Sequence, residues 1–315
     1  MEPDSASVAP PVPDAAPDDD AGIRPRRPWL AALLNLLAAP LGHVYAGAPW
    51  RGLAVAVAAT AAGLGALAAT MLPLPGVARM TLLAAGLAMR LLPPWDGWRV
   101  AAAGRQYRLR AYNRWYAYVA VAVAVVVAGD RLSAAFRARV AAAFRMASPS
   151  MHATLFEGEY VMVRPGVSHP VAPGTPVLFR SQHGFVAVAR VVGAGGDTLR
   201  MRGGTLLRNG AAQREPYAIQ TPAGGDTLSL MAWQVEHLAD PADSVGYAPT
   251  MDDWGPLVVP PGHYFLMGDN RDRSGDSRIM GFTRRRDVVG RPMWIYYSRD
   301  AWDGTRWNRL GRAIR

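Results

Sequence analysis

The clearest pattern in this chain is a series of apolar segments in its first half, separated by short polar stretches. Residues 52–78 carry no charged side chain and are long enough to cross about 30 Å of hydrocarbon as a helix. Residues 77–95 carry arginines only towards their ends, where long side chains can reach the interface. Residues 112–129 begin with aromatic side chains, as interfacial belts do. Residues 29–49 are broken by proline and glycine, so we expect a re-entrant or interfacial segment there.

Arginines between the apolar segments indicate the orientation in the membrane. The stretch from Arg99 to Arg114 holds five arginines, so the positive-inside rule places it in the cytoplasm. The next apolar segment then runs outward and leaves everything after Asp130 on the external (periplasmic) face of an inner or plasma membrane. Four complete spans from a cytoplasmic N-terminus would leave the second half inside. We therefore predict about three spans plus one re-entrant or interfacial segment within residues 29–130.

Two further stretches flank this membrane region. Residues 1–28 are rich in Pro, Ala and Asp without an apolar period, which predicts a disordered tail. Because the tail begins acidic, we expect no cleavable secretory signal at this position. Residues 131–147 carry apolar side chains at every fourth position with arginines between them, which predicts an amphipathic connector on the membrane surface. Those apolar residues are Leu132, Phe136, Val140 and Phe144.

The second half of the chain has a different texture. After residue 148, short apolar runs are separated by Pro, Gly and Asp, which predicts an antiparallel, sandwich-like β domain over residues 148–315. The stretch 209–254 is poor in period and predicts little regular structure. The predicted fold class is therefore mixed: N-terminal transmembrane helices, then a mainly antiparallel β domain. The expected strands lie in residues 159–163, 175–180, 184–193, 257–260, 263–269 and 292–298.

Composition narrows the chemistry. The formal charge is +10, and all 34 basic residues are arginines because the sequence contains no lysine. The positive balance suits contact with anionic lipid head groups, and no basic run is interleaved with aromatics, so we predict membrane lipids as partners and no nucleic acid. The absence of cysteine excludes disulfides, thiolate zinc sites and Cys nucleophiles. We predict no metal or other cofactor.

Four motifs in the second half follow one another in a recognisable order. They are "SPSMHATL" at 148–155, "PGTPVLF" at 173–179, "ARVVGAGGD" at 189–197 and "GDNRDRSGDSRIMGF" at 268–282. In this order they resemble the boxes of the signal peptidase I (leader peptidase) family of membrane serine proteases. The last box is the most specific, and the first alone would equally describe a capped turn. The resemblance implies a signal-peptidase-like β fold with a serine protease activity.

The resemblance also implies roles for individual residues. Ser150 matches the nucleophile, and Ser148 matches a residue whose hydroxyl helps to hold the oxyanion. Charged side chains of the long box cannot lie unpaired in an apolar core, so we expect a hydrogen-bonded ion-pair cluster that supports the site, with Arg190 as a partner across strands. The site-supporting residues are Arg190, Asp269, Arg271, Asp272, Ser274, Asp276 and Arg278.

The general base of the family is a lysine, and its position in this chain is Ala189. Arg190 cannot replace it, because a guanidinium stays protonated and neighbouring strand residues face opposite ways. Among the six histidines, His152 is the candidate substitute base. It lies two residues from Ser150, so an extended backbone would place both side chains on one face, about 7 Å apart at Cα, where a water could bridge them. The competing interpretation is a histidine that lines the groove.

Three functional hypotheses follow. The first is a signal peptidase that cleaves exported, signal-peptide-bearing precursors after a small residue, with His152 or a water in place of lysine. The second is a catalytically inactive homologue that binds signal-peptide or other extended segments, since binding at a sheet edge needs no base. The third is a membrane protein whose apolar half is the functional part and whose β domain is a sensor. The serines and the long box favour the first, and Ala189 favours the second.

Overall fold

The computed structural model describes residues 23–24, 26–104, 107–108, 110–220, 228–300 and 304–315. Of the predicted disordered tail, residues 1–22 and 25 lie outside the described residues. The chain divides into two compact units. The helical unit comprises residues Met1–Ala62 and Ala88–Ala128, and the β unit comprises Gly63–Leu87 and Gly129–Arg315.

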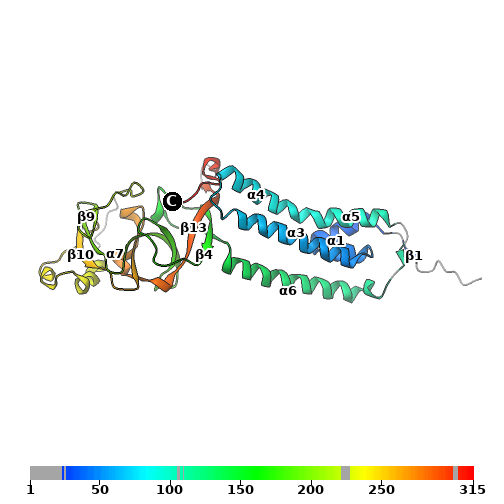
Figure 1. Cartoon of the computed structure of the whole chain (residues 1–315), viewed down its shortest axis with the longest axis horizontal. Helices are drawn as coiled ribbons and strands as arrows, with labels where there is room; N and C mark the ends of the chain where they lie inside the picture. Colours follow the sequence, from blue (N-terminus) through cyan, green and yellow to red (C-terminus); the bar gives the residue numbers. More distant parts are fainter. Residues whose placement is uncertain (1–22, 25, 105–106, 109, 221–227, 301–303) are drawn as a thin grey trace, which may run out of the picture. The chain divides into compact units, whose positions relative to one another are not determined.

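Three helices in the described part of the chain are long and apolar enough to cross a membrane. They are α3 (Pro49–Ala69), the continuous stretch Gly76–Ala103, and α6 (Trp115–Arg139) (Figure 1). The stretch Gly76–Ala103 consists of α4 (Gly76–Ala88), a 3₁₀ turn (η1, Met89–Leu91) and α5 (Leu92–Ala103). The prolines near the start of α5 are tolerated because the first turn of a helix has no intrahelical acceptor for the N–H that proline lacks. The helical stretch therefore continues beyond residue 95, where the sequence predicted its end. The chain is a membrane protein with three candidate spans.

The first apolar segment forms two short helices. Helix α1 (Pro28–Leu37) ends before Pro40, and α2 (Leu41–Tyr45) begins directly after it. Two-residue strands β1 (Ile23–Arg24) and β2 (Tyr107–Arg108) pair antiparallel, and a 3₁₀ turn (η2, Ala111–Asn113) precedes α6. Neither α1 nor α2 is long enough to span a bilayer.

A buried polar cluster joins the helices of the helical unit. The Asn35 side chain donates from Nδ2 to the Pro93 carbonyl (2.7 Å) and to His43 Nδ1 (2.9 Å), while its Oδ1 accepts from the Gly42 N–H (2.8 Å). This pattern fixes the orientation of the amide and leaves the other ring nitrogen of His43, Nε2, to donate to Asp96 (3.0 Å). Arg51 completes the cluster with two bonds to Asp96 of 2.9 and 2.7 Å.

The β unit is built on a seven-stranded antiparallel sheet with the order β12-β11-β6-β5-β13-β4-β3. A second antiparallel sheet has the order β10-β7-β8-β9, and β14 pairs with β15. The strands of the large sheet are β3 (Ala142–Arg145), β4 (Tyr160–Pro165), β5 (Pro176–Arg180), β6 (Val186–Ala194), β11 (His263–Met267), β12 (Thr283–Arg284) and β13 (Val288–Tyr297). The others are β7 (Thr198–Arg202), β8 (Thr205–Arg208), β9 (Ala211–Ala212), β10 (Trp254–Val258), β14 (Arg299–Asp300) and β15 (Gly304–Thr305).

These elements confirm the predicted fold class, apolar helices followed by an antiparallel β domain, and each expected run contains a strand. The β7–β8 hairpin was not predicted. The stretch 209–254 holds two 3₁₀ segments, η4 (Leu228–His237) and η5 (Pro241–Ser244), and little other regular structure. The remaining short helices are η3 (Pro149–Met151), η6 (Arg271–Arg273), α7 (Ser277–Met280), η7 (Arg285–Asp287) and η8 (Trp307–Arg309).

Residues 131–147, predicted as a connector, comprise the last turns of α6 and strand β3. The helix continues through Asp130 to Arg139 because the sequence between them contains neither Pro nor Gly to end it. Within the β unit, an apolar cluster then joins helix ends to the sheet. It contains Met71 from the turn after α3, Phe136 from α6, and Met162 and Trp294 from β4 and β13.

The two faces of the large sheet bury different apolar clusters. Along β6, Val188 packs with Met151 and Leu155 on one face. Ala189 packs with Val177 on the other. Side chains along β6 thus alternate between the two faces of the sheet, as the sequence predicted. This alternation determines the apolar cluster in which each residue of β6 packs.

Candidate active site

Ser148 and Ser150 lie on the loop that follows β3. Ser148 has an extended backbone and an exposed side chain, and Pro149 then starts the 3₁₀ turn that carries Ser150, which is half-buried. The two hydroxyl oxygens are 3.0 Å apart, a hydrogen-bond distance in which either can donate. The turn therefore brings together the two side chains predicted to act as nucleophile and oxyanion helper.

Backbone contacts hold this turn against the long box. The Asn270 N–H donates to the Ser150 carbonyl (2.9 Å), and the Asn270 side chain donates to the Pro149 carbonyl (3.4 Å). A Cβ atom at Gly268 would lie 2.6 Å from the Ser150 carbonyl oxygen and 2.2 Å from Ser274 Oγ. Only glycine allows this approach of the two backbones, so the box fixes the position of the serine turn.

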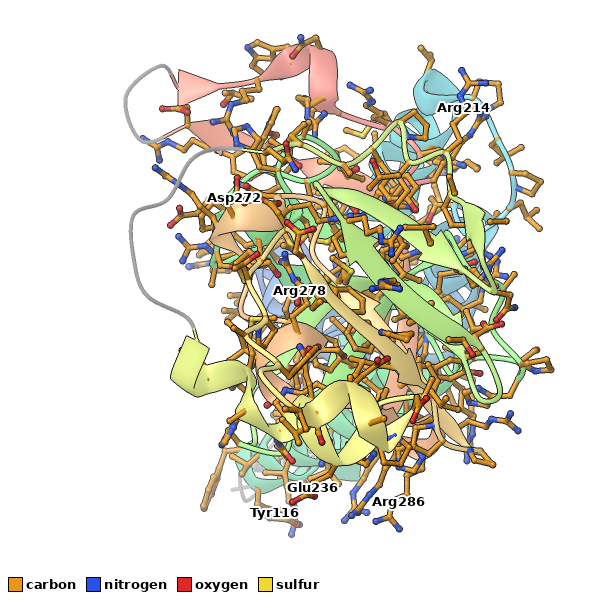
Figure 2. The ribbon with its side chains drawn as sticks, turned by 90° about the vertical axis from the view of Figure 1, so that its left-hand side faces the viewer. Tyr116, Arg214, Glu236, Asp272, Arg278 and Arg286 are labelled. Atoms are coloured by element: carbon orange, nitrogen blue, oxygen red, sulfur yellow. The ribbon has the colours of Figure 1, made fainter. Side chains whose placement is uncertain are left out.

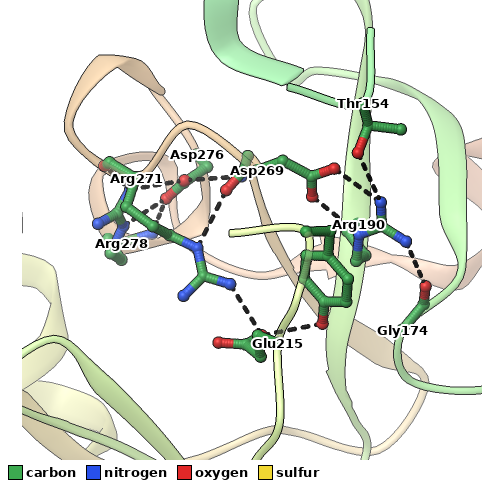
Figure 3. Close-up of polar contacts among 10 residues, drawn as sticks. Thr154, Gly174, Arg190, Glu215, Asp269, Arg271, Asp276 and Arg278 are labelled. Atoms are coloured by element: carbon green, nitrogen blue, oxygen red, sulfur yellow. Dashed lines mark hydrogen bonds and ion pairs between the residues drawn. The ribbon is translucent and has the colours of Figure 1, made fainter. Parts of the chain in front are cut away.

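Arg190 and Asp269 form a buried, bidentate ion pair between β6 and the end of β11. Arg190 Nε and Nη2 donate to the carboxylate at 2.8 and 2.7 Å, and both side chains are almost fully buried (Figure 3). Nη1 of the same guanidinium donates to the Gly174 carbonyl (2.6 Å), and Nη2 contacts Thr154 Oγ1 (3.4 Å). The guanidinium thereby ties the loop after Ser150 to the strand pair.

A second ion pair involves a segment that the sequence motifs did not indicate. Arg271 pairs with Glu215 at 2.8 Å, and Tyr217 donates its hydroxyl to Glu215 (3.0 Å) while its ring lies 3.8 Å from the Arg190 guanidinium carbon (Figure 3). Burial raises the pKa of Tyr217, and the charge of Glu215 adds to this, so the phenol stays protonated. Burial alone would lower the pKa of Arg271, but the bond to Glu215 and its charge raise it.

The third ion pair is internal to the long box. Arg278 donates from Nε and Nη2 to Asp276 at 2.9 Å each, and Asp276 also accepts the Gly268 N–H (3.0 Å). The Arg278 guanidinium further donates to the Arg271 carbonyl (2.5 Å). Trp233 and Gln234 of η4 donate to the Arg278 carbonyl, so the otherwise irregular stretch 209–254 also contacts the box.

Asp272 differs from the other predicted members of the cluster. It is half-buried and makes no ion pair with any residue that the structure describes, whereas the neighbouring Arg271 pairs with Glu215. Figure 2 marks it together with Arg278, which is fully buried. Ser274 is buried against Gly268, beside the serine turn. The predicted ion-pair cluster thus holds Arg190, Asp269, Arg271, Asp276 and Arg278 without Asp272.

His152 is exposed, and its ring lies edge-on against the Phe156 ring with centroids 4.5 Å apart. No hydrogen bond links it to Ser150 among the described residues. The backbone here turns through η3 instead of running extended, so the geometric reason for expecting both side chains on one face does not hold.

Ala189 is buried on β6 in the apolar cluster with Val177, Phe179 and Leu266. Arg190 pairs with Met267, the last residue of β11, and Gly268 follows directly in the sequence. Gly268 is also the residue that touches the Ser150 backbone. Ala189 therefore lies in an apolar setting, on the strand that pairs with β11, which leads to Gly268.

Comparison with known proteins now identifies the family. The family model described as "Signal peptidase, peptidase S26" matches residues 113–297, which is more than half of the chain. The chain belongs to the signal peptidase family. It is therefore a serine peptide hydrolase by family, as the resemblance of its four motifs implied.

Individual signal peptidases are similar to about half of this chain. Signal peptidase I of Bacillus licheniformis is 31% identical over 182 residues, which cover 56% of this chain and 86% of the relative. Signal peptidase I of Pseudomonas aeruginosa is 30% identical over 185 residues, covering 49% and 64% respectively. A crystal structure of a signal peptidase I from Enterococcus faecalis is 25% identical and covers 40% of this chain and 98% of its own, with a TM-score of 0.27.

Sequence reasoning missed four residues that support the signal-peptidase motifs. Glu215 and Tyr217 contact Arg271 and Arg190 from a segment without recognisable period. Glu159 and Arg309 form a further buried ion pair at 2.7 Å, although 150 positions separate them in the sequence. Within the described ranges, no group of three or more His, Cys, Asp or Glu side chains could hold a metal ion.

Proposed function

We propose that this signal-peptidase homologue is a membrane-bound endopeptidase that removes signal peptides from exported precursor proteins. Ser150 acts as the nucleophile, and Ser148 helps to hold the oxyanion. The observation that carries this proposal is the 3.0 Å contact between the two hydroxyls on a turn whose backbone is bound to the long box through Asn270. Membership of the signal peptidase family supports precursor proteins as the substrate class.

The proton acceptor is the unusual part of this proposal. We assign the lysine position of the family to Ala189, because it precedes Arg190, the partner of Asp269. An alanine accepts no proton, so a water at the serine turn, or His152 after a rotation away from Phe156, takes the proton of Ser150. Either acceptor would work less well than a neutral lysine in an apolar pocket, and we expect slow turnover.

A second function is supported by two observations. Ala189 completes an apolar cluster and leaves no base there, and β3, at the end of the sheet, pairs with β4 alone among the named strands. Such an edge can accept an extended segment through main-chain hydrogen bonds. The alternative is therefore a homologue that binds signal-peptide or other extended segments without cutting them.

Cleavage of a precursor bearing an Ala-x-Ala site by the full-length protein in detergent separates these functions. We expect slow cleavage by the native chain, none by Ser150→Ala, and an altered rate in His152→Ala only if the imidazole is the acceptor. Binding without any cleavage would replace the first function by the second. Cleavage that persists in Ser150→Ala would contradict the role of this serine.

We also propose that the β domain, residues 148–315, lies on the external face, with residues 29–130 as the membrane region. The five arginines between Arg99 and Arg114 support this orientation through the positive-inside rule. A reporter fused after residue 105 should behave as cytoplasmic, and one fused after residue 315 as external. The reverse pattern would contradict the proposed orientation and place the β domain on the cytoplasmic side.

A further inference from the structure

Residues 307–315, which we call the C-terminal strap, run antiparallel beside β13. The Ile295 N–H donates to the Arg312 carbonyl (3.0 Å), and the Gly311 N–H returns a bond to the Ile295 carbonyl (2.8 Å). A third bond runs from the Ile314 N–H to the Met293 carbonyl (2.9 Å). These ladder bonds fix the strap to the large sheet, beyond the end of β5.

The strap contacts the loop that carries Ser150. Arg309 donates to the Thr154 carbonyl (2.8 Å) and forms two bonds to Glu159, of 2.7 and 2.9 Å. Glu159 in turn accepts the Phe156 N–H (3.0 Å). Since these groups are buried or partly buried, the strap supplies hydrogen bonds that the irregular loop cannot make within itself.

The end of the strap contacts the site from a second direction. Ile314 is buried in the apolar cluster that contains Met151, the residue after the nucleophile, and Leu155. The Arg315 carbonyl accepts a bond from Arg190 Nη1 (3.1 Å). The strap therefore touches both the core beneath the serine turn and the guanidinium that binds Asp269.

At Gly311 the strap is also fixed to the turn between α3 and α4. Gly311 has a φ of +75°, and a Cβ atom there would lie 2.6 Å from the Gly76 carbonyl oxygen. Arg79 of α4 donates to the Gly311 carbonyl (3.2 Å) and to the Leu72 carbonyl (3.4 Å), and its side chain is buried. Figure 1 shows the red C-terminal segment at the start of α4. A buried guanidinium on two carbonyls is a specific contact, because it would be costly without both partners.

We propose that the α3–α4 turn is a positioning element for Ser150 and acts through the C-terminal strap. Gly76, Arg79 and Gly311 are positioning residues, since none of them belongs to the serine turn. The α3–α4 turn orders the C-terminal strap, and the strap in turn orders the loop 152–159 and the Arg190 side chain. The catalytic significance of this arrangement rests on the proposed role of Ser150, whereas the ordering of the loop does not.

Hydrogen–deuterium exchange on the full-length protein in detergent tests the ordering directly. In Gly311→Ala, the amides of Leu155, Gly158 and Glu159 should exchange at least about tenfold faster, because their bonds lie in the loop held by the strap. Gly304→Ala is the matched control, since Gly304 has a φ of +79° but nothing within 4 Å of an added Cβ. Equal exchange in the two variants would overturn the proposal.

Variants in α3 and α4 keep the test decisive if Gly311→Ala fails to fold. In Gly76→Ala the added Cβ meets the Gly311 carbonyl at 3.1 Å, whereas in Gly65→Ala it meets nothing within 4 Å. Arg79→Gln, compared with the exposed Arg90→Gln, removes the bond to the strap. Gly76→Ala and Arg79→Gln should speed exchange in residues 152–159, not in the β7–β8 hairpin. Unchanged exchange of residues 152–159 in both variants would contradict the proposal. So would an equal acceleration of exchange in the β7–β8 hairpin.

The same variants separate positioning from general loss of structure in the cleavage assay. With the melting midpoint preserved, Arg79→Gln should lower kcat and leave KM unchanged, because substrate still binds while the serine turn is less ordered. A raised KM with unchanged kcat would assign the strap to substrate binding and overturn the positioning role. If the native chain does not cleave, the proposed function fails, and the exchange data still decide the ordering of the loop.

Discussion

The helical unit and the β unit each bury a polar network, but they stabilise it in different ways. In the described part of the helical unit, the ion pair of Asp96 with Arg51 is joined to the side chains of His43 and Asn35, and the Arg51 side chain is 56% exposed. In the β unit, the three ion pairs around the long box are almost fully buried, and Arg190 and Arg278 bond to backbone carbonyls as well. The backbone N–H and C=O groups of the helices are hydrogen-bonded within each helix, so the network of the helical unit only joins the helices. The network of the β unit also supplies hydrogen bonds to backbone groups of irregular loops.

The glycines around the two networks show the same contrast. A Cβ at Gly97 would lie 2.2 Å from the Asn35 amide, and a Cβ at Gly52 would lie 2.3 Å from His43, so helix backbones close over the first network. At the second network, Gly268 allows one loop to approach another. Loss of the second network should therefore disturb more of the fold than loss of the first.

The largest effect that we expect is in Asp276→Ala. The substitution leaves the Arg278 guanidinium buried without its carboxylate and the Gly268 N–H without its acceptor. Breaking a buried ion pair by removing one partner costs about 3–5 kcal/mol. Denaturant unfolding of the full-length protein, followed by hydrogen exchange of the amides in the β unit, measures this change.

Asp272→Ala is the matched control, because this aspartate of the same box is half-buried and has no ion pair among the described residues. We expect a change within about 0.5 kcal/mol. Equal destabilisation by both substitutions would show that acidic residues of the box act through net charge and not through the buried pairs.

A smaller effect should follow from Asn35→Ala in the helical unit. It leaves the Gly42 N–H, the Pro93 carbonyl and His43 Nδ1 without their partner. Interhelical hydrogen bonds in membrane proteins contribute about 0.6 kcal/mol each on average, so the loss should be about 2 kcal/mol. Thermal unfolding of the helices in detergent, followed by circular dichroism, is the measurement.

Leu36→Ala tests whether the asparagine effect is specific. Leu36 is the next residue on α1 and its side chain is 64% exposed, so its truncation should change the stability of the helices by less than that of Asn35. A cost of Asn35→Ala that equals or exceeds that of Asp276→Ala would reverse the comparison between the two networks.

The sequence predicted the fold class and the charged residues of the long box that form ion pairs, but it carried no signal of the polar network in the helical unit. The spacing of apolar residues and the Pro or Gly residues at their boundaries predict where the strands lie. The long box places Asp269, Asp276 and Arg278 within one short segment. Asn35 and Asp96, in contrast, come from separate helices and carry no motif. The same physical reason hid Glu159 and Arg309, whose pairing depends on tertiary contacts.

Position 189 shows where local reasoning was sufficient. The alternation of side chains along β6 predicted that Ala189 and Arg190 face opposite ways, and the structure places them in an apolar cluster and in the ion-pair network respectively. The same reasoning was wrong for His152, because it assumed an extended backbone where Pro149 starts a 3₁₀ turn.

The most direct test of the central claim compares precursor cleavage by the native chain with that by Ala189→Lys in the full-length protein. A lysine in this apolar cluster would have a lowered pKa and could accept the proton of Ser150. We predict slow cleavage by the native chain and a rate at least about tenfold higher in Ala189→Lys, lost again when Ser150→Ala is added. A folded Ala189→Lys variant that cleaves no faster would contradict the assignment of position 189 as the missing base.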